Sequence, residues 1–296
     1  MAINLSVEEI RSSWAIADAE RDKGLTVPDD LKCFYDIPYG EHGKENLLDI
    51  YVQKNVTDKQ PVIFNIHGGA WVYGSKEIYK FYCMKLAQKG FTVVNINYRL
   101  APENVFPSAL EDINNAVKFV EKYGKDYYAD KDRIIIVGDS AGAQLASHYS
   151  AILTNKDFSK LFSFELPDVK VKALGLNCGV YDGMATALDS EEKLFRKYLG
   201  FAESQPDEKI LAMTDTMKNI TSAFPPSFIM SCEEDFLLPN AEPMYRHLKA
   251  LGVPVVMKIY GKKGQTEISH VFHINCRLDE ADRCNNDECE FFRKFV

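Results

Sequence analysis

The 296-residue sequence lacks the features that mark several specialised protein classes. It contains no run of about 18 apolar residues, which a membrane-spanning helix would need. It has no basic excess, because 35 Lys and Arg stand against 43 Asp and Glu, a formal charge of −8. A nucleic-acid partner, which calls for a basic surface, is therefore not expected. Repeats, low-complexity tracts and Gly/Ser linkers are also absent, and 46% hydrophobic residues suit a globular core.

The N-terminal residues lack the apolar stretch of a secretory signal, since charges recur every few positions. The cysteines are odd in number and mostly scattered. They are Cys33, Cys83, Cys178, Cys232, Cys276, Cys284 and Cys289. We therefore expect free thiols in a reducing compartment and a cytoplasmic location.

Short apolar runs alternate with helical patterns along most of the chain. A hairpin is expected from 34–38 and 46–52, and further strands at 61–66, 91–97, 133–137, 171–177, 227–231 and 253–259. Helices are expected at 6–23, 76–89, 107–123 and 141–154. Another helix is expected to end at 251, and a C-terminal helix is expected to begin at about 279. Ser6 and Glu9 have the spacing of a capping box for the first helix. This order predicts an α/β fold with a mostly parallel sheet covered on both faces, whose ligands bind at the carboxyl ends of the strands.

Residues 181–223 interrupt the alternation. They show a charged helical pattern without a convincing strand. We interpret this segment as an insertion that lies over the carboxyl edge of the sheet.

A G-x-S-x-G pattern at 138–142 follows the strand RIIIV and precedes an apolar helix. A sharp strand-to-helix turn leaves little room beside the serine and raises its hydroxyl above the sheet. The alternative is a glycine-lined turn whose serine only caps the helix. The strand and helix on either side favour Ser140 as a nucleophile.

His67-Gly68-Gly69-Ala70 follows the strand PVIFNI. The glycine pair could be only a turn, or it could present backbone N–H groups to an oxyanion. The serine turn some 70 residues later favours the second reading.

A serine nucleophile needs a base and an orienting acid, and both are available at strand ends in the order Ser, acid, His. Glu233, Glu234 and Asp235 follow the strand SFIMS, and each could be the acid. His270 and His273 follow the last strand and remain the candidates for the base.

Five residues near the C-terminus have the donor types that zinc prefers. They are His270, His273, Cys276, Cys284 and Cys289. Their spacing includes no paired C-x2-C, and two of the cysteines fall in an expected helix, where buried thiols are common. We therefore expect no metal site and no other cofactor.

Five blocks together make the sequence similar to the hormone-sensitive-lipase-like branch of the α/β-hydrolase esterases. They are HGGAWVYGS (67–75), NYRLAPENVFPSALED (97–112), GDSAGAQLA (138–146), EEDFLLPNA (233–241) and SHVF (269–272). The resemblance covers the chain from about residue 35 to the end. It implies an α/β-hydrolase core at 32–180 and 224–296. It also implies a helical cap made from residues 1–31 and 181–223.

The resemblance also assigns the site residues. It implies Ser140 as nucleophile, Asp235 as acid and His270 as base. An oxyanion hole would come from the N–H groups of Gly69, Ala70 and Ala141, with Gly68 shaping the loop. Two positions depart from the common family pattern: Ala70 stands where many members have a third glycine, and Ala143 stands where glycine is frequent. A methyl group at either position removes no N–H, but it makes bulky tertiary-alcohol esters poor candidates.

The sequence as a whole therefore predicts a serine carboxylic-ester hydrolase for small, short-acyl esters, with a homodimer as a hypothesis. Deacetylation of acetylated carbohydrate and hydrolysis of an amide or formamide on the same site stay open. A ligand receptor of the same fold is disfavoured, because all three triad residues are present. Phe195 and Tyr198 of the insertion are expected to line the pocket and limit acyl length.

Overall fold

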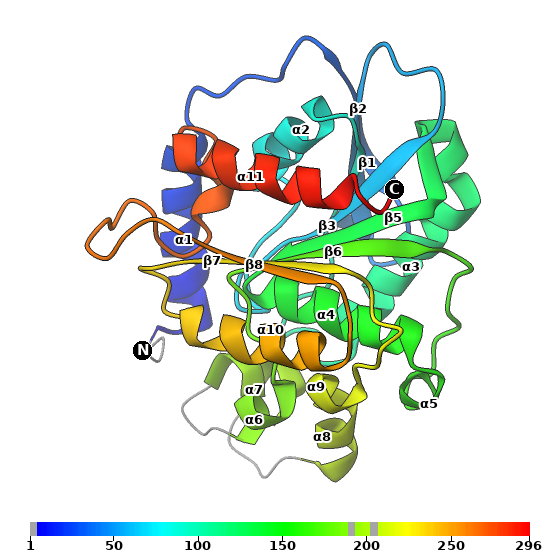
Figure 1. Cartoon of the computed structure of the whole chain (residues 1–296), viewed down its shortest axis with the longest axis vertical. Coiled ribbons are helices and arrows are strands. Elements are labelled where there is room, and N and C mark those ends of the chain that lie inside the picture. The colour runs from blue at the N-terminus through cyan, green and yellow to red at the C-terminus, as the bar shows by residue number, and fades with distance from the viewer. Residues whose placement is uncertain (1–4, 189–192, 202–206) are drawn as a thin grey trace.

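An eight-stranded sheet runs through the molecule (Figure 1). The computed structural model describes residues 5–188, 193–201 and 207–296. The strands are β1 Leu31–Pro38, β2 Leu47–Gln53, β3 Gln60–Ile66, β4 Thr92–Ile96, β5 Ala129–Asp139, β6 Val171–Asn177, β7 Ser227–Cys232 and β8 Val255–Tyr260. Their order in the sheet is β1-β2-β4-β3-β5-β6-β7-β8. The β1–β2 and β2–β4 pairs are antiparallel, and all other neighbours are parallel.

The central strands read as continuous apolar runs because both of their faces are buried. In β5, Ile134 and Ile136 belong to one hydrophobic cluster, whereas Ile135 and Val137 belong to the other. Helices α3 Ser108–Tyr123, α4 Ala141–Thr154 and α10 Ala241–Ala250 cover the first face. Helices α2 Lys80–Gln88 and α11 Asp279–Phe292 cover the second. Figure 1 shows α2 and α11 on one side of the sheet and α4 and α10 on the other.

The predicted α/β class is confirmed, and most expected elements are present. Helix α1 Val7–Asp22 begins with the expected capping box of Ser6 and Glu9. The helix expected at 76–89 begins only at Lys80. The reason is that Lys76 has non-helical partners: its backbone N–H donates to Asn97, and its buried ammonium group forms an ion pair with Asp49 at 2.9 Å.

The segment expected to be an insertion is helical where it is described. It contains α6 Gly183–Leu188, α7 Lys193–Leu199, α8 Glu208–Thr214 and α9 Thr216–Asn219. Its residues 189–192 and 202–206 lie outside the described part of the chain. These helices lie on the α4 and α10 side of the sheet (Figure 1). The α7 side chains Phe195 and Tyr198 belong to the same hydrophobic cluster as α4.

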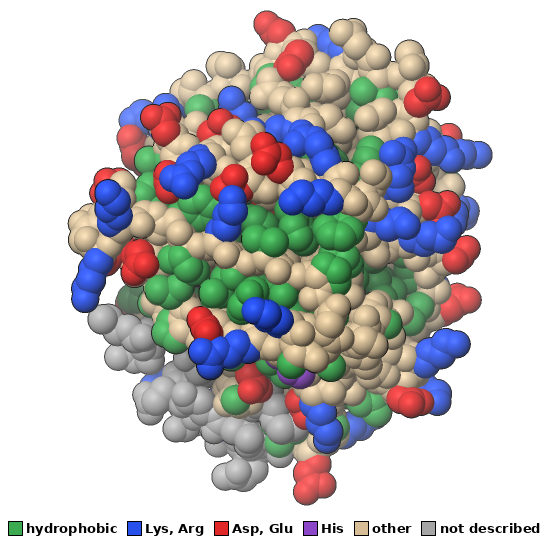
Figure 2. All heavy atoms as spheres, in the orientation of Figure 1, with side chains coloured by type: hydrophobic (Ala, Val, Ile, Leu, Met, Phe, Trp, Pro, Cys, Tyr) green, Lys and Arg blue, Asp and Glu red, His purple; other side chains and the backbone are tan. Residues whose placement is uncertain are grey.

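The surface in Figure 2 carries interspersed acidic and basic side chains, with an apolar band across its middle. The edge strand β8 lies in this region of Figure 1. Within the described ranges, no helix combines the length and apolar character needed to cross a bilayer.

Candidate active site

Ser140 occupies a sharp turn between β5 and α4. Its backbone has φ 52° and ψ −119°, a conformation that non-glycine residues rarely adopt. The flanking glycines are needed for space: a Cβ on Gly138 would collide with the carbonyl oxygen of Gly142, and a Cβ on Gly142 would collide with that of Ile66. The Ser140 N–H donates to the carbonyl oxygen of Asn177 at 2.9 Å, which fixes the turn to β6.

The structure brings Ser140, His270 and Asp235 into one hydrogen-bonded line. His270 Nε2 lies 3.1 Å from Ser140 Oγ, and its Nδ1 lies 2.8 Å from Asp235 Oδ1. The Ser231 hydroxyl and the Leu237 N–H also donate to the Asp235 carboxylate, at 2.7 and 2.9 Å. Burial opposes ionisation of Asp235, but the hydrogen bond and charge of His270 outweigh it and lower the pKa. The carboxylate is thus held ionised and oriented toward the imidazole.

The other acid and base candidates lie elsewhere. Glu233 is exposed, and Glu234 accepts a hydrogen bond from the N–H of Gly264 at 2.5 Å. His273 is buried with its ring edge against Tyr82, at a centroid distance of 5.2 Å. Burial lowers the pKa of His273 to about 3, so it is neutral at physiological pH. Of the alternatives left open by the residues, the geometry favours Asp235 and His270.

Backbone N–H groups without an acceptor line the same cavity as Ser140, in the loop after β3 and at the start of α4. Gly69 has φ 118°, and a Cβ there would collide with the Tyr73 carbonyl oxygen, so glycine is required. Ala70 follows at φ 51°. In the described part of the chain, the N–H groups of Gly69, Ala70 and Ala141 have no acceptor. An anionic oxygen beside Ser140 could therefore accept hydrogen bonds from these N–H groups.

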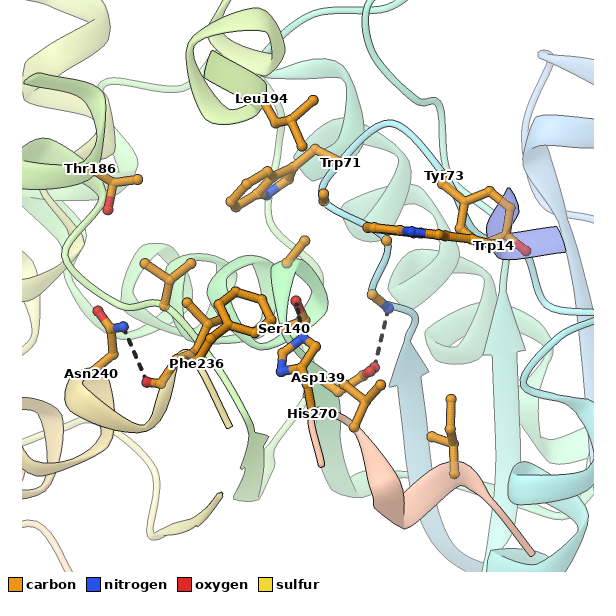
Figure 3. A pocket seen from close by; sticks show the side chains of 18 of the residues that line it. Trp14, Trp71, Tyr73, Asp139, Ser140, Thr186, Leu194, Phe236, Asn240 and His270 are labelled. Carbon is orange, nitrogen blue, oxygen red and sulfur yellow. Dashed lines mark hydrogen bonds between the residues drawn. The ribbon is translucent and has the colours of Figure 1, made fainter. Parts of the chain in front are cut away.

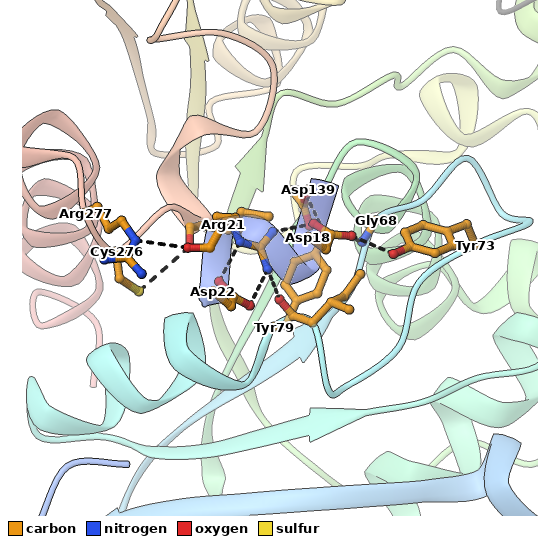
Figure 4. Close-up of polar contacts among 11 residues, drawn as sticks. Asp18, Arg21, Asp22, Gly68, Tyr73, Tyr79, Asp139, Cys276 and Arg277 are labelled. Carbon is orange, nitrogen blue, oxygen red and sulfur yellow. Dashed lines mark hydrogen bonds and ion pairs between the residues drawn. The ribbon is translucent and has the colours of Figure 1, made fainter. Parts of the chain in front are cut away.

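Gly68 plays a different part in the same loop. Its N–H donates to the Tyr79 hydroxyl at 3.0 Å and to Asp139 Oδ1 at 3.1 Å (Figure 4). The Tyr79 hydroxyl in turn donates to Asp139 Oδ2 at 2.7 Å. Burial raises the pKa of Asp139 to about 6. Asp139 and Tyr79 thus hold the loop in place, a role that sequence reasoning missed. The second letter of G-D-S-A-G was a weak signal for Asp139, and Tyr79 had none.

A cavity of about 610 Å³ opens above Ser140 (Figure 3). Trp14 of α1 and Leu194 of α7 line it, and Phe236 packs on the His270 ring at a centroid distance of 4.5 Å. The expectation for Phe195 and Tyr198 is wrong: they pack behind Trp71, at 4.7 and 5.7 Å between ring centroids, and do not line the cavity. They face away because α7 turns its most apolar side toward the core.

The residues considered for zinc do not form a group. Among the described residues, one set of three His, Cys, Asp or Glu side chains has its donor atoms within 4.8 Å of one another. This set is Cys178, Asp235 and His270. Two of these are the hydrogen-bonded acid and base described above. Cys284 and Cys289 are buried on α11 in the second hydrophobic cluster.

Curated relatives of this chain carry esterase names. Esterase LipQ of Mycobacterium tuberculosis is 31% identical over 217 residues, which are 70% of this chain and 50% of LipQ. The probable carboxylic ester hydrolase LipM of the same organism is 40% identical over 150 residues, 50% of this chain and 34% of LipM. The versiconal hemiacetal acetate esterase of Dothistroma septosporum is 31% identical over 69% of this chain and 66% of that protein. The chain spans about half the length of LipQ, and less of LipM.

Solved structures match nearly the whole chain. Esterase B from Lactobacillus rhamnosis superposes with a TM-score of 0.85 at 22% identity, covering 97% of this chain and 96% of that one. An esterase from Pyrobaculum calidifontis gives 0.75 at 23% identity, covering 98% and 92%. These likenesses confirm the α/β-hydrolase fold.

The BD-FAE family model matches residues 48–248, more than half of the chain. The expected kinship with hormone-sensitive-lipase-like α/β-hydrolase esterases is therefore confirmed, and the chain belongs to the BD-FAE family.

Proposed function

We propose that this protein is a serine carboxylesterase that hydrolyses small, short-acyl esters. The observation that carries the proposal is the line from Ser140 through His270 to Asp235, at 3.1 and 2.8 Å, at the base of a 610 Å³ cavity. The esterase names of its relatives support the same reaction class.

In this mechanism His270 Nε2 takes the proton of Ser140 Oγ as the oxygen attacks the ester carbonyl. Asp235 holds Nδ1–H, which fixes the tautomer and stabilises the imidazolium. The N–H groups of Gly69, Ala70 and Ala141 stabilise the tetrahedral oxyanion. The imidazolium then protonates the leaving alcohol. Water repeats the sequence on the acyl-enzyme and releases the acid.

The proposed substrate size follows from what closes the cavity. We assign residues 1–31 and 181–223 to a cap, because Trp14 of α1 and Leu194 of α7 both line the space above Ser140. About 610 Å³ is within the range for small-molecule sites. Each added methylene should improve binding by up to ~0.8 kcal/mol only until the space is filled.

The test is hydrolysis of p-nitrophenyl esters from acetate to decanoate by the wild type and by Ser140→Ala. We expect kcat/KM to fall beyond about six acyl carbons, where buried area stops growing. Ser140→Ala should lose at least about a thousandfold in kcat and stay folded, because the short side chain contributes little packing. An organophosphate should label the wild type once, at Ser140.

Two results would contradict the proposal in different ways. Normal turnover by Ser140→Ala would remove the mechanism. A preference for emulsified long-chain triglycerides would leave the mechanism in place and overturn the substrate size.

A further inference from the structure

One end of the cavity is built around a carboxylate, Asp18. Asp18 comes from α1 and lines the cavity together with Trp14, Tyr73 and Ile78. Figure 3 shows Trp14 and Tyr73 on one side of Ser140 and Thr186 and Asn240 on the opposite side. The Tyr73 hydroxyl donates to Asp18 Oδ2 at 2.7 Å (Figure 4). A substrate attached at Ser140 would direct one of its two arms toward this end.

The charge near Asp18 is only partly balanced. Arg21 bonds Asp18 at 2.6 Å, but it also forms two hydrogen bonds of 2.7 Å with Asp22. The three side chains together therefore carry one negative charge. Asp18 lines the cavity, whereas its ion-pair partner Arg21 and the second acid Asp22 do not. Among the described lining residues, the only Lys or Arg is Lys193, which is exposed on α7.

Burial leaves the Asp18 carboxylate short of compensation. Desolvation raises its pKa, although Tyr73 and Arg21 both act in the opposite direction. Its side chain is 18% exposed. The attraction of a second cation in the cavity would offset part of the solvation free energy that this carboxylate has lost.

Aromatic residues line the same cavity. Trp14 meets Tyr73 edge to face at 5.7 Å, and Trp71 lines the cavity nearby. In the described part of the chain, no Lys or Arg is stacked over the rings of Trp14, Trp71 or Tyr73. Electron-rich ring faces beside a carboxylate form the chemical environment that selects alkylammonium groups.

We propose that the Asp18 end of the cavity binds a substituted ammonium group on one arm of the ester, so that cationic esters are preferred over neutral esters of equal shape. This inference rests on the proposed esterase activity and adds the class of substrate. It predicts that charge, and not size alone, sets the selectivity of the enzyme.

The experiment compares two pairs of substrates that differ only in one charged atom. Acetylthiocholine and S-(3,3-dimethylbutyl) thioacetate place the cation, or its neutral carbon replacement, on the leaving group. The p-nitrophenyl esters of 4-(trimethylammonio)butanoate and 5,5-dimethylhexanoate place it on the acyl group. Each kcat/KM is divided by the rate constant for hydroxide, which removes the difference in intrinsic reactivity. We expect a cationic-to-neutral ratio of about tenfold or more in one pair.

Two variants test whether Asp18 causes the preference for cationic esters. Asp18→Asn keeps the shape and removes the charge that faces the cavity, so the cationic-to-neutral ratio should fall about tenfold. Asp22→Asn is the matched control, because Asp22 also bonds Arg21 but lies outside the cavity. It should lower the ratio clearly less than Asp18→Asn does, because the charge that it removes lies outside the cavity. If Asp18→Asn does not fold, inhibition of the wild type by choline and by 3,3-dimethyl-1-butanol replaces it, with choline expected to bind about tenfold more tightly.

A ratio at or below one in both pairs, or equal effects of Asp18→Asn and Asp22→Asn, would overturn the inference. Hydrolysis of p-nitrophenyl acetate in the same assays would then leave the proposed esterase function standing. Loss of that activity as well would show that the proposed function itself is wrong.

Discussion

At the scale of single residues, backbone strain is concentrated around the candidate nucleophile. Ser140 has φ 52°, and Ala70 and Trp71 of the facing loop have φ 51° and 62°. Each non-glycine residue in this region costs on the order of 1 kcal/mol, so the surrounding fold must hold it there. The Asn177 carbonyl does so for Ser140. All three strained residues line the same cavity, which favours a chemical role over a structural one.

Asp235→Asn tests the role of the acid. An amide neither balances the imidazolium nor fixes the Nδ1 tautomer, so kcat should fall by roughly a hundredfold to ten-thousandfold. KM should change little, because Asp235 lies behind His270 and does not line the cavity. The measurement is steady-state hydrolysis of p-nitrophenyl acetate.

Glu234→Gln is the matched control for this variant. Glu234 is one residue away and bonds Gly264 instead of a histidine. Its kcat should stay within about twofold of the wild type. Equal losses in the two variants would contradict the assignment of Asp235.

Sequence can mark a residue where the backbone imposes a local pattern. The glycines at 138 and 142 mark Ser140 because the turn itself excludes side chains. No local pattern marks Asp18 or Tyr79. Their roles depend on contacts with Tyr73 and with Asp139, which are 55 and 60 positions away in the chain.

At the scale of elements, α7 shows how a helix divides its residues between core and cavity. Phe195 is fully buried against Trp71, whereas its neighbour Leu194 is directed to the cavity. The sequence predicted a helical cap here but not which residues face the substrate, because α7 has only seven residues and is apolar on several sides.

Phe195→Ala and Leu194→Ala should therefore have different effects. Phe195→Ala should lower the free energy of unfolding by about 3–5 kcal/mol, because it leaves a cavity in a packed aromatic cluster. Leu194→Ala should instead shift the optimum of the p-nitrophenyl ester series toward longer acyl chains. Urea denaturation and the ester series measure the two effects. A longer optimum in Phe195→Ala alone would show that the two side chains have been assigned to the wrong sides.

At the scale of the whole molecule, the class of fold could be predicted from sequence, but the order of the strands could not. Alternating apolar runs and helices identify a parallel sheet. Periodicity does not reveal that β3 lies between β4 and β5, or that β1 and β2 extend the edge. Strand ends were also missed: β5 begins at Ala129, four residues before the expected apolar run. Ala129 pairs with Gln60 of β3, and regular pairing resumes only at Ile134 opposite Val62, so the polar residues between them lie at an irregularity of the ladder.

Glu288 links the stability of the whole fold to pH. It lies on α11, fully buried, and its Oε1 accepts a hydrogen bond from Asn177 at 3.0 Å. Within the described residues, Oε2 has no partner. Burial raises the pKa to about 8, from 4.5 for an ordinary glutamate, although the Asn177 hydrogen bond opposes this rise. In sequence, Glu288 is one of several acids on an amphipathic helix, so nothing marks it.

The sign of the effect follows from proton binding. Between pH 4.5 and 8 the folded protein keeps the Glu288 proton that the unfolded chain has lost. The contribution of this group to stability is therefore fully present below pH 4.5 and declines as the pH rises toward 8. Glu288→Gln keeps an acceptor for Asn177 and cannot ionise. It should exceed the wild type in unfolding free energy at pH 8 by on the order of 1–3 kcal/mol, and by much less at pH 5.

Urea denaturation at pH 5, 6.5 and 8 measures this difference. Glu290→Gln is the control, since Glu290 is exposed on the same helix and should show no trend with pH. A constant difference between Glu288→Gln and the wild type at all three pH values would mean that Glu288 binds no extra proton in the folded state. A difference that grows with pH would show that Glu288 keeps its proton in the folded state and that ionising it weakens the fold.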